Sequence, residues 1–262
     1  MNRIYERHWL KFAKGGKMKY IGHLDLLRIF QSAIRRAKLP IAYSMGFNPH
    51  QRISFALPLS VGMESVCEYM ELLFDKEDTQ ENKLPIDIMT LDNFLPDGIR
   101  LLSATTVSEN APRPAAAVMA ADYRVVFNTS SDKSLDGGKY FNSPVEIQKE
   151  IQKEIQKKVQ DVLNADVLIY ETKKKEKKNI RPDILDLNYD PVGAVNMRLS
   201  AGSTRSVSPE AVASFIFPDT IKNNKLAMVR LELYNGKLVP LHEIARQYIS
   251  EIPKISLQKE AK

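Results

Sequence analysis

The sequence of 262 residues contains a single cysteine, Cys67. One cysteine excludes an internal disulfide and cannot supply the thiolates of a zinc site or an iron–sulfur cluster. The four histidines, His8, His23, His50 and His242, are scattered and show no HExxH or paired-ligand spacing. GxGxxG, P-loop and GxSxG motifs are missing as well. We therefore expect no metal and no cofactor, and a self-contained metal, nucleotide or serine-hydrolase enzyme is disfavoured.

Long hydrophobic runs are also missing. No apolar stretch approaches the roughly 20 residues that a membrane span requires. The first residues, MNRIYERHW, lack the apolar segment of a secretory signal. With 44% hydrophobic and 27% charged residues, the composition is that of an ordinary globular protein. These features predict a cytoplasmic protein that has no membrane partner.

Charge is unevenly distributed along the chain, although the net charge is only +6. Residues 1–60 hold 11 lysines and arginines against 2 acidic residues, a balance of +9. Residues 61–120 hold 4 against 11, a balance of −7. A positive N-terminal segment can attract polyanions at long range. The alternative is that the acidic segment neutralises it within one domain.

The hydrophobic periodicity predicts an α+β protein in which one order of elements occurs twice. Alternation and amphipathic spacing favour strands at 7–14, 52–57, 66–74 and 99–107, and helices at 23–39 and 85–95. The second half is expected to hold strands at 122–127, 166–172, 194–200 and 226–234, with helices at 144–163, from Pro209 and at 241–252. Two successive β-α-β-β-α-β units are typical of a tandem ferredoxin-like architecture. The predicted domains are 1–108 and 121–262, joined by a linker at 109–120.

The segment SMGFNPHQR, residues 44–52, combines turn residues with side chains that can bind a ligand. Gly46 supplies backbone freedom, and Pro49 forces Asn48 into an extended conformation. Such a rigid loop can present Phe47 as a stacking platform, with His50 and Arg52 beside it for phosphates or base edges. His50 is also a possible general acid or base, but no carboxylate partner is identifiable from the sequence.

The helix at 23–39 carries a second, basic stripe in addition to its apolar one. Arg28, Gln31, Arg35 and Lys38 are spaced to share one face, and Arg36 flanks them. Guanidinium groups bind phosphates in bidentate fashion, although the stripe can equally be a solvated charged face. His23 begins this helix, where it can cap the backbone or meet a ligand. The lysine run at 173–178 is interpreted as a solvated hairpin, with phosphate contact as the alternative.

Residues 11–74 closely resemble the radical-SAM-linked domain family, an uncharacterised bacterial family. The resemblance is carried by HLDLLR, RRAKLPIAYSMGFNPH and ISFALPLSVGMES, and it continues weakly through NIRPDI at 179–184. Members of that family occur alone or fused behind a cobalamin-type radical S-adenosylmethionine protein. Gly22 stands where the family often has a serine, and residues 207–209 read VSP where its arginine–proline pair is usual. The resemblance implies pairing with a radical enzyme, whose cluster cysteines this chain cannot supply.

These observations favour a non-catalytic RNA-binding protein that works with a radical S-adenosylmethionine enzyme in modifying tRNA or rRNA. The predicted RNA-binding residues are His23, Arg28, Arg35, Arg36, Phe47, Asn48, His50 and Arg52. One alternative is a metal-independent endoribonuclease that uses His50 or His23, by fold analogy with CRISPR repeat-processing enzymes. A second alternative is a protein–protein adaptor that docks on the radical enzyme through the acidic residues 61–97.

Overall fold

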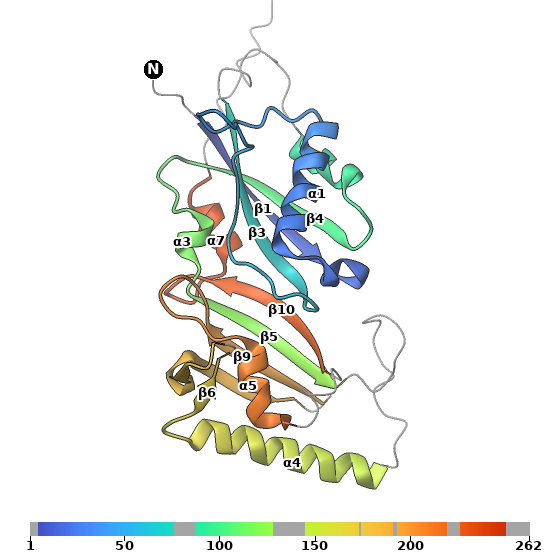
Figure 1. Cartoon of the computed structure of the whole chain (residues 1–262), viewed down its shortest axis with the longest axis vertical. Coiled ribbons are helices and arrows are strands. Elements are labelled where there is room, and N and C mark those ends of the chain that lie inside the picture. The colour runs from blue at the N-terminus through green and yellow to red at the C-terminus, as the bar shows by residue number, and fades with distance from the viewer. Residues whose placement is uncertain are drawn as a thin grey trace, which may run out of the picture.

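The fold is known from a computed structural model, which describes residues 5–75, 87–127, 145–172, 174–190, 193–218 and 226–249 (Figure 1). The N-terminal half consists of β1 (Tyr5–Lys14), η1 (Gly16–Tyr20), α1 (His23–Arg36), β2 (Ile53–Phe55), β3 (Glu64–Asp75), η2 (Ile88–Phe94), β4 (Ile99–Val107) and α3 (Pro114–Ala117). The C-terminal half consists of β5 (Ala120–Phe127), α4 (Val145–Asn164), β6 (Ile169–Glu171), β7 (Lys177–Asn179), η3 (Arg181–Asp183), β8 (Ile184–Tyr189), β9 (Ala194–Ser200), α5 (Pro209–Ile216), β10 (Leu226–Tyr234) and α7 (Leu241–Gln247).

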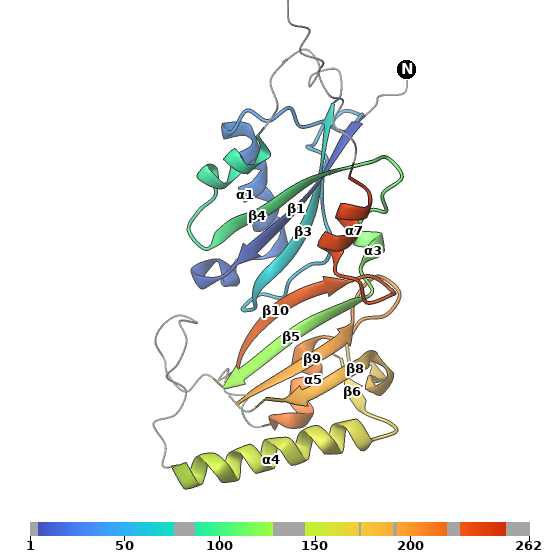
Figure 2. The ribbon, with the colours of Figure 1, turned by 180° about the vertical axis from the view of Figure 1, so that it is seen from behind.

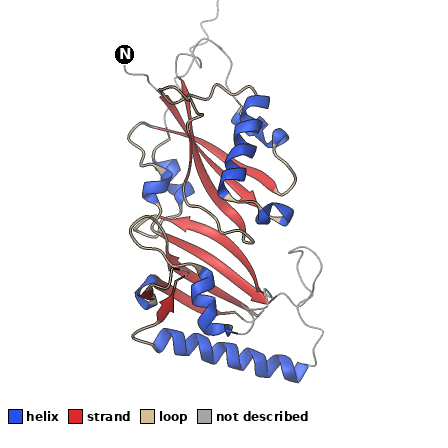
Figure 3. Cartoon of the chain, in the orientation of Figure 1, coloured by secondary structure: helices blue, strands red, loops and turns tan. Residues whose placement is uncertain are grey.

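One eight-stranded sheet runs through both halves in the order β4-β1-β3-β10-β5-β9-β8, with β2 added to β3 (Figure 3). Within each half all strand pairs are antiparallel. Each half contributes four strands to this sheet, in the order β4-β1-β3-β2 for the N-terminal half and β10-β5-β9-β8 for the C-terminal half. Counted along the chain, both orders are fourth, first, third, second. Strands β6 and β7 form a separate two-stranded sheet. The halves meet where β3 and β10 pair in parallel, at Glu64 with Val229 and Ser65 with Arg230. The other part of the same β3 edge pairs with β2.

The core of the N-terminal half lies between α1 and one face of the sheet. Alternate residues of β1, including Leu10 and Phe12, point to this side and are fully buried. On α1, the buried face carries Leu26, Phe30, Ala33 and Ile34, which follow the helical repeat. The rings of Phe12 and Phe30 meet edge to face, with their centroids 4.9 Å apart. This packing fixes which face of α1 remains open to solvent.

A second core joins the opposite face of the N-terminal strands to the C-terminal half. Trp9, Cys67 and Tyr69 belong to the same buried cluster as the inner residues of α4, α5 and α7. Figure 2, the view from behind, shows α7 over the N-terminal strands, with α4 running below the C-terminal ones. Helix α4 contributes Ile155, Val159 and Val162 as its buried stripe. The two halves therefore share hydrophobic packing as well as a sheet.

The predicted α+β class is confirmed, and several boundaries need correction. The second predicted helix, 85–95, is a 3₁₀ segment from Ile88 to Phe94, and residues 85 and 86 lie outside the described part. Helix α1 ends at Arg36, because Lys38 takes a left-handed backbone conformation with φ of 54° ahead of Pro40. Lys38 therefore does not continue the basic stripe. Strand β8 was not predicted, and the end of the helix predicted at 241–252 lies outside the described residues.

The segment predicted as a linker packs closely against the first strand. The guanidinium of Arg7 donates to the carbonyls of Glu109 and Ala111, at 2.9 and 2.6 Å. Pro114 and Val118 of the same segment are buried. None of the helices among the described residues has the length and hydropathy to cross a membrane.

Candidate nucleic-acid interface

The loop between Tyr43 and Gln51 projects from a base of strand-like contacts. Tyr43 and Gln51 form an antiparallel bridge. Beneath them, the amide of Arg52 donates to the carbonyl of Ala42 at 2.8 Å, and the amide of Ala42 donates to the carbonyl of Leu73 at 2.7 Å. The loop is thereby attached to β3, the central strand of the N-terminal half. The base of the loop is therefore held by buried residues, Ala42 and Leu73.

Ser44 and His50 close the loop above this base. The amide of Ser44 donates to the carbonyl of His50 at 2.9 Å, and the amide of His50 donates to the Ser44 hydroxyl oxygen at 3.1 Å. The same hydroxyl lies 2.8 Å from Nδ1 of the His50 ring. No ion pair joins His50 to a carboxylate in the part of the chain that the structure describes. These contacts give His50 a positioning role in the loop.

Phe47 stands at the tip of this loop and is fully exposed, at 107% of its reference area. Gly46 before it has φ of +124°, a conformation that residues with a side chain rarely adopt. Met45 is 78% exposed, and Asn48 is exposed as well. The loop thus presents an aromatic ring to solvent on a closed backbone, which is the form of a stacking platform.

Arg52 lies at the base of the loop, beside the first strand. Its guanidinium is placed over the ring of Tyr5, 5.0 Å from the ring centroid, and the residue is half-buried. A cation–π contact of this kind holds the side chain in one region without using its hydrogen-bond donors. Arg52 is therefore available to an anionic ligand near the loop.

The three arginines of α1 have different surroundings. Arg28 pairs with Asp25, one turn earlier, at 2.9 Å, and both side chains are largely exposed. Arg36 donates to the carbonyl of Phe94 and lies over its ring at 5.8 Å, so it ties α1 to η2. Arg35 is exposed and forms no ion pair among the described residues. Of the three, Arg35 has the guanidinium with the fewest contacts inside the protein.

His23 is the first residue of α1, and its ring meets the ring of Phe55 edge to face, with centroids 5.1 Å apart. Gly22 is the N-cap and makes no side-chain hydrogen bond. About 20 Å of helix separates His23 from Arg36, at 1.5 Å per residue. No hydrogen bond, ion pair or ring contact of the described residues links Phe47 or His50 to α1. The predicted residues therefore occupy three places: the start of α1, its outer face and the loop.

The alternative interpretation of the charge asymmetry holds for part of the N-terminal segment. Arg7 pairs with Glu71 and Lys19 with Glu64, both on β3. Lys11 pairs with a carboxylate of the C-terminal half. Four cations of residues 5–60 remain exposed without an ion pair among the described residues, although one of them, Arg36, is bound to Phe94: Lys17, Arg35, Arg36 and Lys38. The positive surface is smaller than the sequence count indicates.

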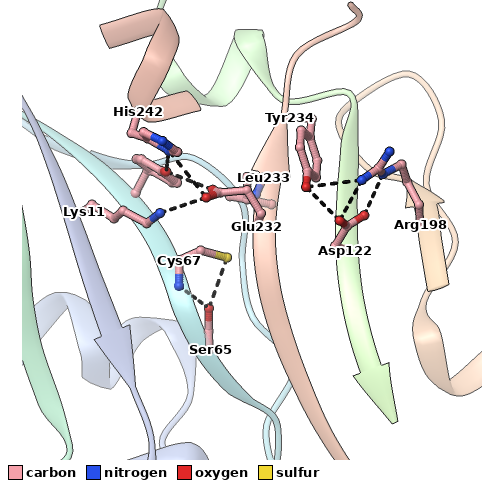
Figure 4. A network of polar contacts seen from close by, with 10 residues as sticks. Lys11, Ser65, Cys67, Asp122, Arg198, Glu232, Leu233, Tyr234 and His242 are labelled. Atoms are coloured by element: carbon pink, nitrogen blue, oxygen red, sulfur yellow. Dashed lines mark hydrogen bonds and ion pairs between the residues drawn. The ribbon is translucent and has the colours of Figure 1, made fainter. Parts of the chain in front are cut away.

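Sequence reasoning missed a polar network at the junction of the two halves (Figure 4). Glu232 of β10 accepts from Lys11 Nζ at 2.8 Å and from the Tyr69 hydroxyl at 2.9 Å. His242 of α7 places Nδ1 3.4 Å from the same carboxylate. Burial, and then the charge of Glu232, raise the pKa of Tyr69, which keeps its hydroxyl protonated as a donor. The network joins β1, β3, β10 and α7.

A second group in Figure 4 lies within the C-terminal half. The carboxylate of Asp122 receives two hydrogen bonds from Arg198, at 2.7 and 2.8 Å, and one from the Tyr234 hydroxyl at 2.7 Å. Burial and the hydrogen bond to Asp122 raise the pKa of Tyr234 to about 12. All of these donors and acceptors are engaged with one another. The group stabilises the strand order and offers no free nucleophile.

Buried charges reinforce the junction between β3 and β10. Arg230 donates to Glu68 at 2.9 Å and to the carbonyl of Pro58 at 3.0 Å, and both charged side chains are 4% exposed. Lys14, also buried, donates to the carbonyl of Ile21 at 2.9 Å. Burial is the main cause that lowers the pKa of Lys14. Arg230 and Glu68 are far apart in the chain, so no local motif could reveal this pair.

The described residues contain no group of histidine, cysteine or acidic side chains arranged to hold a metal ion. Cys67 is fully buried, and burial raises the pKa of its thiol, so it is a core residue.

Residues 7–209 match the family model DUF2344, described as an uncharacterised protein conserved in bacteria. The match spans most of the chain, which therefore belongs to this family. A search of curated proteins finds no match. The expected membership of an uncharacterised bacterial family is thus confirmed, whereas the connection to radical S-adenosylmethionine enzymes remains a prediction.

Proposed function

We propose that this protein is an accessory RNA-binding protein that presents tRNA or rRNA to a radical S-adenosylmethionine enzyme for modification. The observation that carries the proposal is the complete exposure of Phe47 on a loop closed by Ser44 and His50. An exposed aromatic ring on a fixed backbone loses little conformational freedom when a base stacks on it. Arg52 and the exposed Arg35 supply cations for the phosphates on the same half of the protein.

The surroundings of the candidate reactive side chains support the accessory role. Its one thiol, Cys67, is buried, and His50 is hydrogen-bonded to Ser44. Among the described residues no carboxylate pairs with the His50 ring, and the Cys67 thiol is closed off from solvent. The radical chemistry would belong to the partner enzyme, and its cytoplasmic setting is part of the same proposal.

We also infer that each half is a ferredoxin-like unit. The repeated strand order, fourth-first-third-second with antiparallel neighbours, supports this, as does the position of α1 between β1 and β2. In this arrangement the two units share one sheet through β3 and β10.

RNA binding is tested by titrating the protein with tRNA and rRNA fragments over a range of salt concentrations. The proposal predicts binding at low salt, with the logarithm of the binding constant falling linearly with the logarithm of salt concentration. Binding that is undetectable at low salt, or that has no salt slope, would contradict it.

The same preparation separates the two other functions. Incubation with labelled RNA in a chelator tests the endoribonuclease: cleavage that disappears in a His50→Ala variant would support that enzyme and overturn the accessory role. Co-purification with the radical enzyme that survives nuclease treatment, without RNA affinity, would instead support an adaptor.

A further inference from the structure

A buried carboxylate in the C-terminal half holds two exposed cations. Asp183, in η3, is fully buried, whereas the side chains of Arg205 and Lys178 are 60% and 44% exposed. Nε of Arg205 donates to Oδ1 of Asp183 at 2.8 Å. Nζ of Lys178 lies 3.1 Å from Oδ2 without hydrogen-bond alignment, and it donates to the carbonyl of Ser206 at 2.9 Å. The carboxylate thus holds Arg205 at Nε, which leaves its terminal nitrogens outside the contact, and it holds Lys178 by the terminal ammonium itself.

The two terminal nitrogens of Arg205 have no hydrogen-bond partner among the described residues. Two arginines paired elsewhere in the structure differ in this respect. Arg198 uses both Nε and Nη2 on Asp122, and Arg230 uses both terminal nitrogens on protein oxygens. A guanidinium held at Nε with a free outer edge retains the fork of donors that binds a phosphate in bidentate fashion.

The loop that carries Arg205 has a fixed base. The amide of Val207 donates to the carbonyl of Ser200 at 3.1 Å, and the amide of Ala201 donates to the carbonyl of Met119 at 2.9 Å. Gly202 has φ of +138°, and a Cβ there would lie 2.4 Å from a backbone oxygen of Val118. Between these contacts, residues 203–206 are exposed. The loop therefore holds Arg205 at a defined position beside Lys178.

Positive charge exceeds negative charge around the pair. Arg181 is directed inward, donating to the carbonyls of Leu163 and Ile184. The hairpin β6–β7 adds exposed Lys174, Lys175 and Lys177 against exposed Glu171 and Glu176. Asp183 and these two glutamates together supply three negative charges against the five positive charges of Arg205, Lys178 and the three hairpin lysines. The surface at Arg205 and Lys178 is consequently suited to an anion.

We propose that Arg205 and Lys178 form a second phosphate-binding site, positioned by Asp183, for the backbone of the RNA that the Phe47 loop binds. The site rests on the proposed function and assigns a role to the C-terminal half. The RNA would then contact both halves of the continuous sheet. Recognition at this site is by phosphate charge and is independent of base identity.

The experiment measures RNA affinity against salt concentration for the full chain and for Arg205→Gln, Lys178→Gln and the control Lys237→Gln. Lys237 is exposed in the turn after β10, so its variant removes the same charge elsewhere. Each site variant should lower the salt slope by about 1 and weaken binding to all sequences alike, since one phosphate contact is lost. Melting temperatures identify any variant that is not folded, and Lys178→Gln carries the test if Arg205→Gln fails to fold.

The outcomes separate this site from the proposed function. Loss of slope in both site variants beyond that in Lys237→Gln supports the second site. Slopes equal to the control, with binding still dependent on Phe47, overturn the second site and leave the proposed function intact. A wild-type protein that binds no RNA overturns both.

Discussion

At the scale of single residues, His8 makes the stability of the protein depend on pH. It is 3% exposed beside the ring of Phe74, with Nδ1 3.0 Å from the Thr106 hydroxyl. Burial lowers its pKa from 6.5 to about 4. The folded state therefore binds fewer protons than the unfolded state between these pH values, so stability is present above pH 6.5 and is lost as the pH falls towards 4.

We expect His8 to contribute up to about 3 kcal/mol to this decline, because each tenfold change in proton affinity corresponds to about 1.4 kcal/mol. The carboxylate of Glu6, 3.4 Å from Nε2, reduces the loss by stabilising the charged ring. Urea unfolding at pH 7 and pH 4.5 measures the effect. The His8→Gln variant should show a clearly smaller difference between the two conditions, and an unchanged difference would contradict the assignment.

The buried pair of Arg230 and Glu68 supports a second residue-scale prediction. Removing Arg230 leaves the buried Glu68 without its ion-pair partner, so Arg230→Ala should destabilise the protein by about 3–5 kcal/mol. The matched control is Arg100→Ala. The Arg100 side chain is 76% exposed in its pair with Asp92, and its loss should change stability by less than about 0.5 kcal/mol. Chemical denaturation measures the free energy of unfolding of both variants. Equal losses of stability would show that the buried pair contributes no more than the exposed one.

At the scale of elements, two glycines that lie beside Val118 and Met119 form a natural comparison. Gly202 has φ of +138° and no room for a Cβ, whereas at Gly236 the nearest atom to a Cβ is 3.7 Å away. Gly202→Ala should lower the free energy of unfolding by about 2 kcal/mol or more, and Gly236→Ala should change it by less than about 1 kcal/mol. Thermal unfolding tests this, and a fully stable Gly202→Ala protein would exclude a rigid base for the Arg205 loop.

Local patterns in the sequence predicted elements best where they repeat over many residues. The strands at 99–107, 194–200 and 226–234 appear with the predicted bounds, and Ser208 caps α5 as expected, accepting from the amide of Ala211. Strand β8 was missed because its buried and exposed residues do not alternate regularly. The contact between Arg36 and Phe94 was also missed, because it depends on tertiary packing.

The candidate site was predictable as a loop but not as a surface. Gly46 and Pro49 indicate a turn, and its exposed Phe47 follows from that turn. Which of the eleven N-terminal cations are neutralised depends on strand pairing between β1, β3 and β10, which brings Glu71 and Glu232 to Arg7 and Lys11. No local spacing in the sequence encodes those pairings. For the same reason the grouping of Asp183 with Arg205 required the structure.

At the scale of the whole molecule, the shared sheet and shared core predict one cooperative unfolding unit. Trp9, the only tryptophan, is 2% exposed in the core cluster that includes residues of both halves. Its fluorescence and the far-ultraviolet circular dichroism should therefore change over the same range of denaturant. Two separate transitions would show that the halves are independently stable.

The central claim is that the exposed ring of Phe47 binds an unpaired base of RNA. The most direct measurement compares RNA affinity at low salt for the wild type, Phe47→Ala and the loop control Met45→Ala. We expect Phe47→Ala to lose about 1–3 kcal/mol of binding free energy while the melting temperature stays unchanged, because the ring makes no packing contact to lose. Met45→Ala should bind nearly as well as the wild type. A Phe47→Ala protein that binds RNA with wild-type affinity would contradict the account.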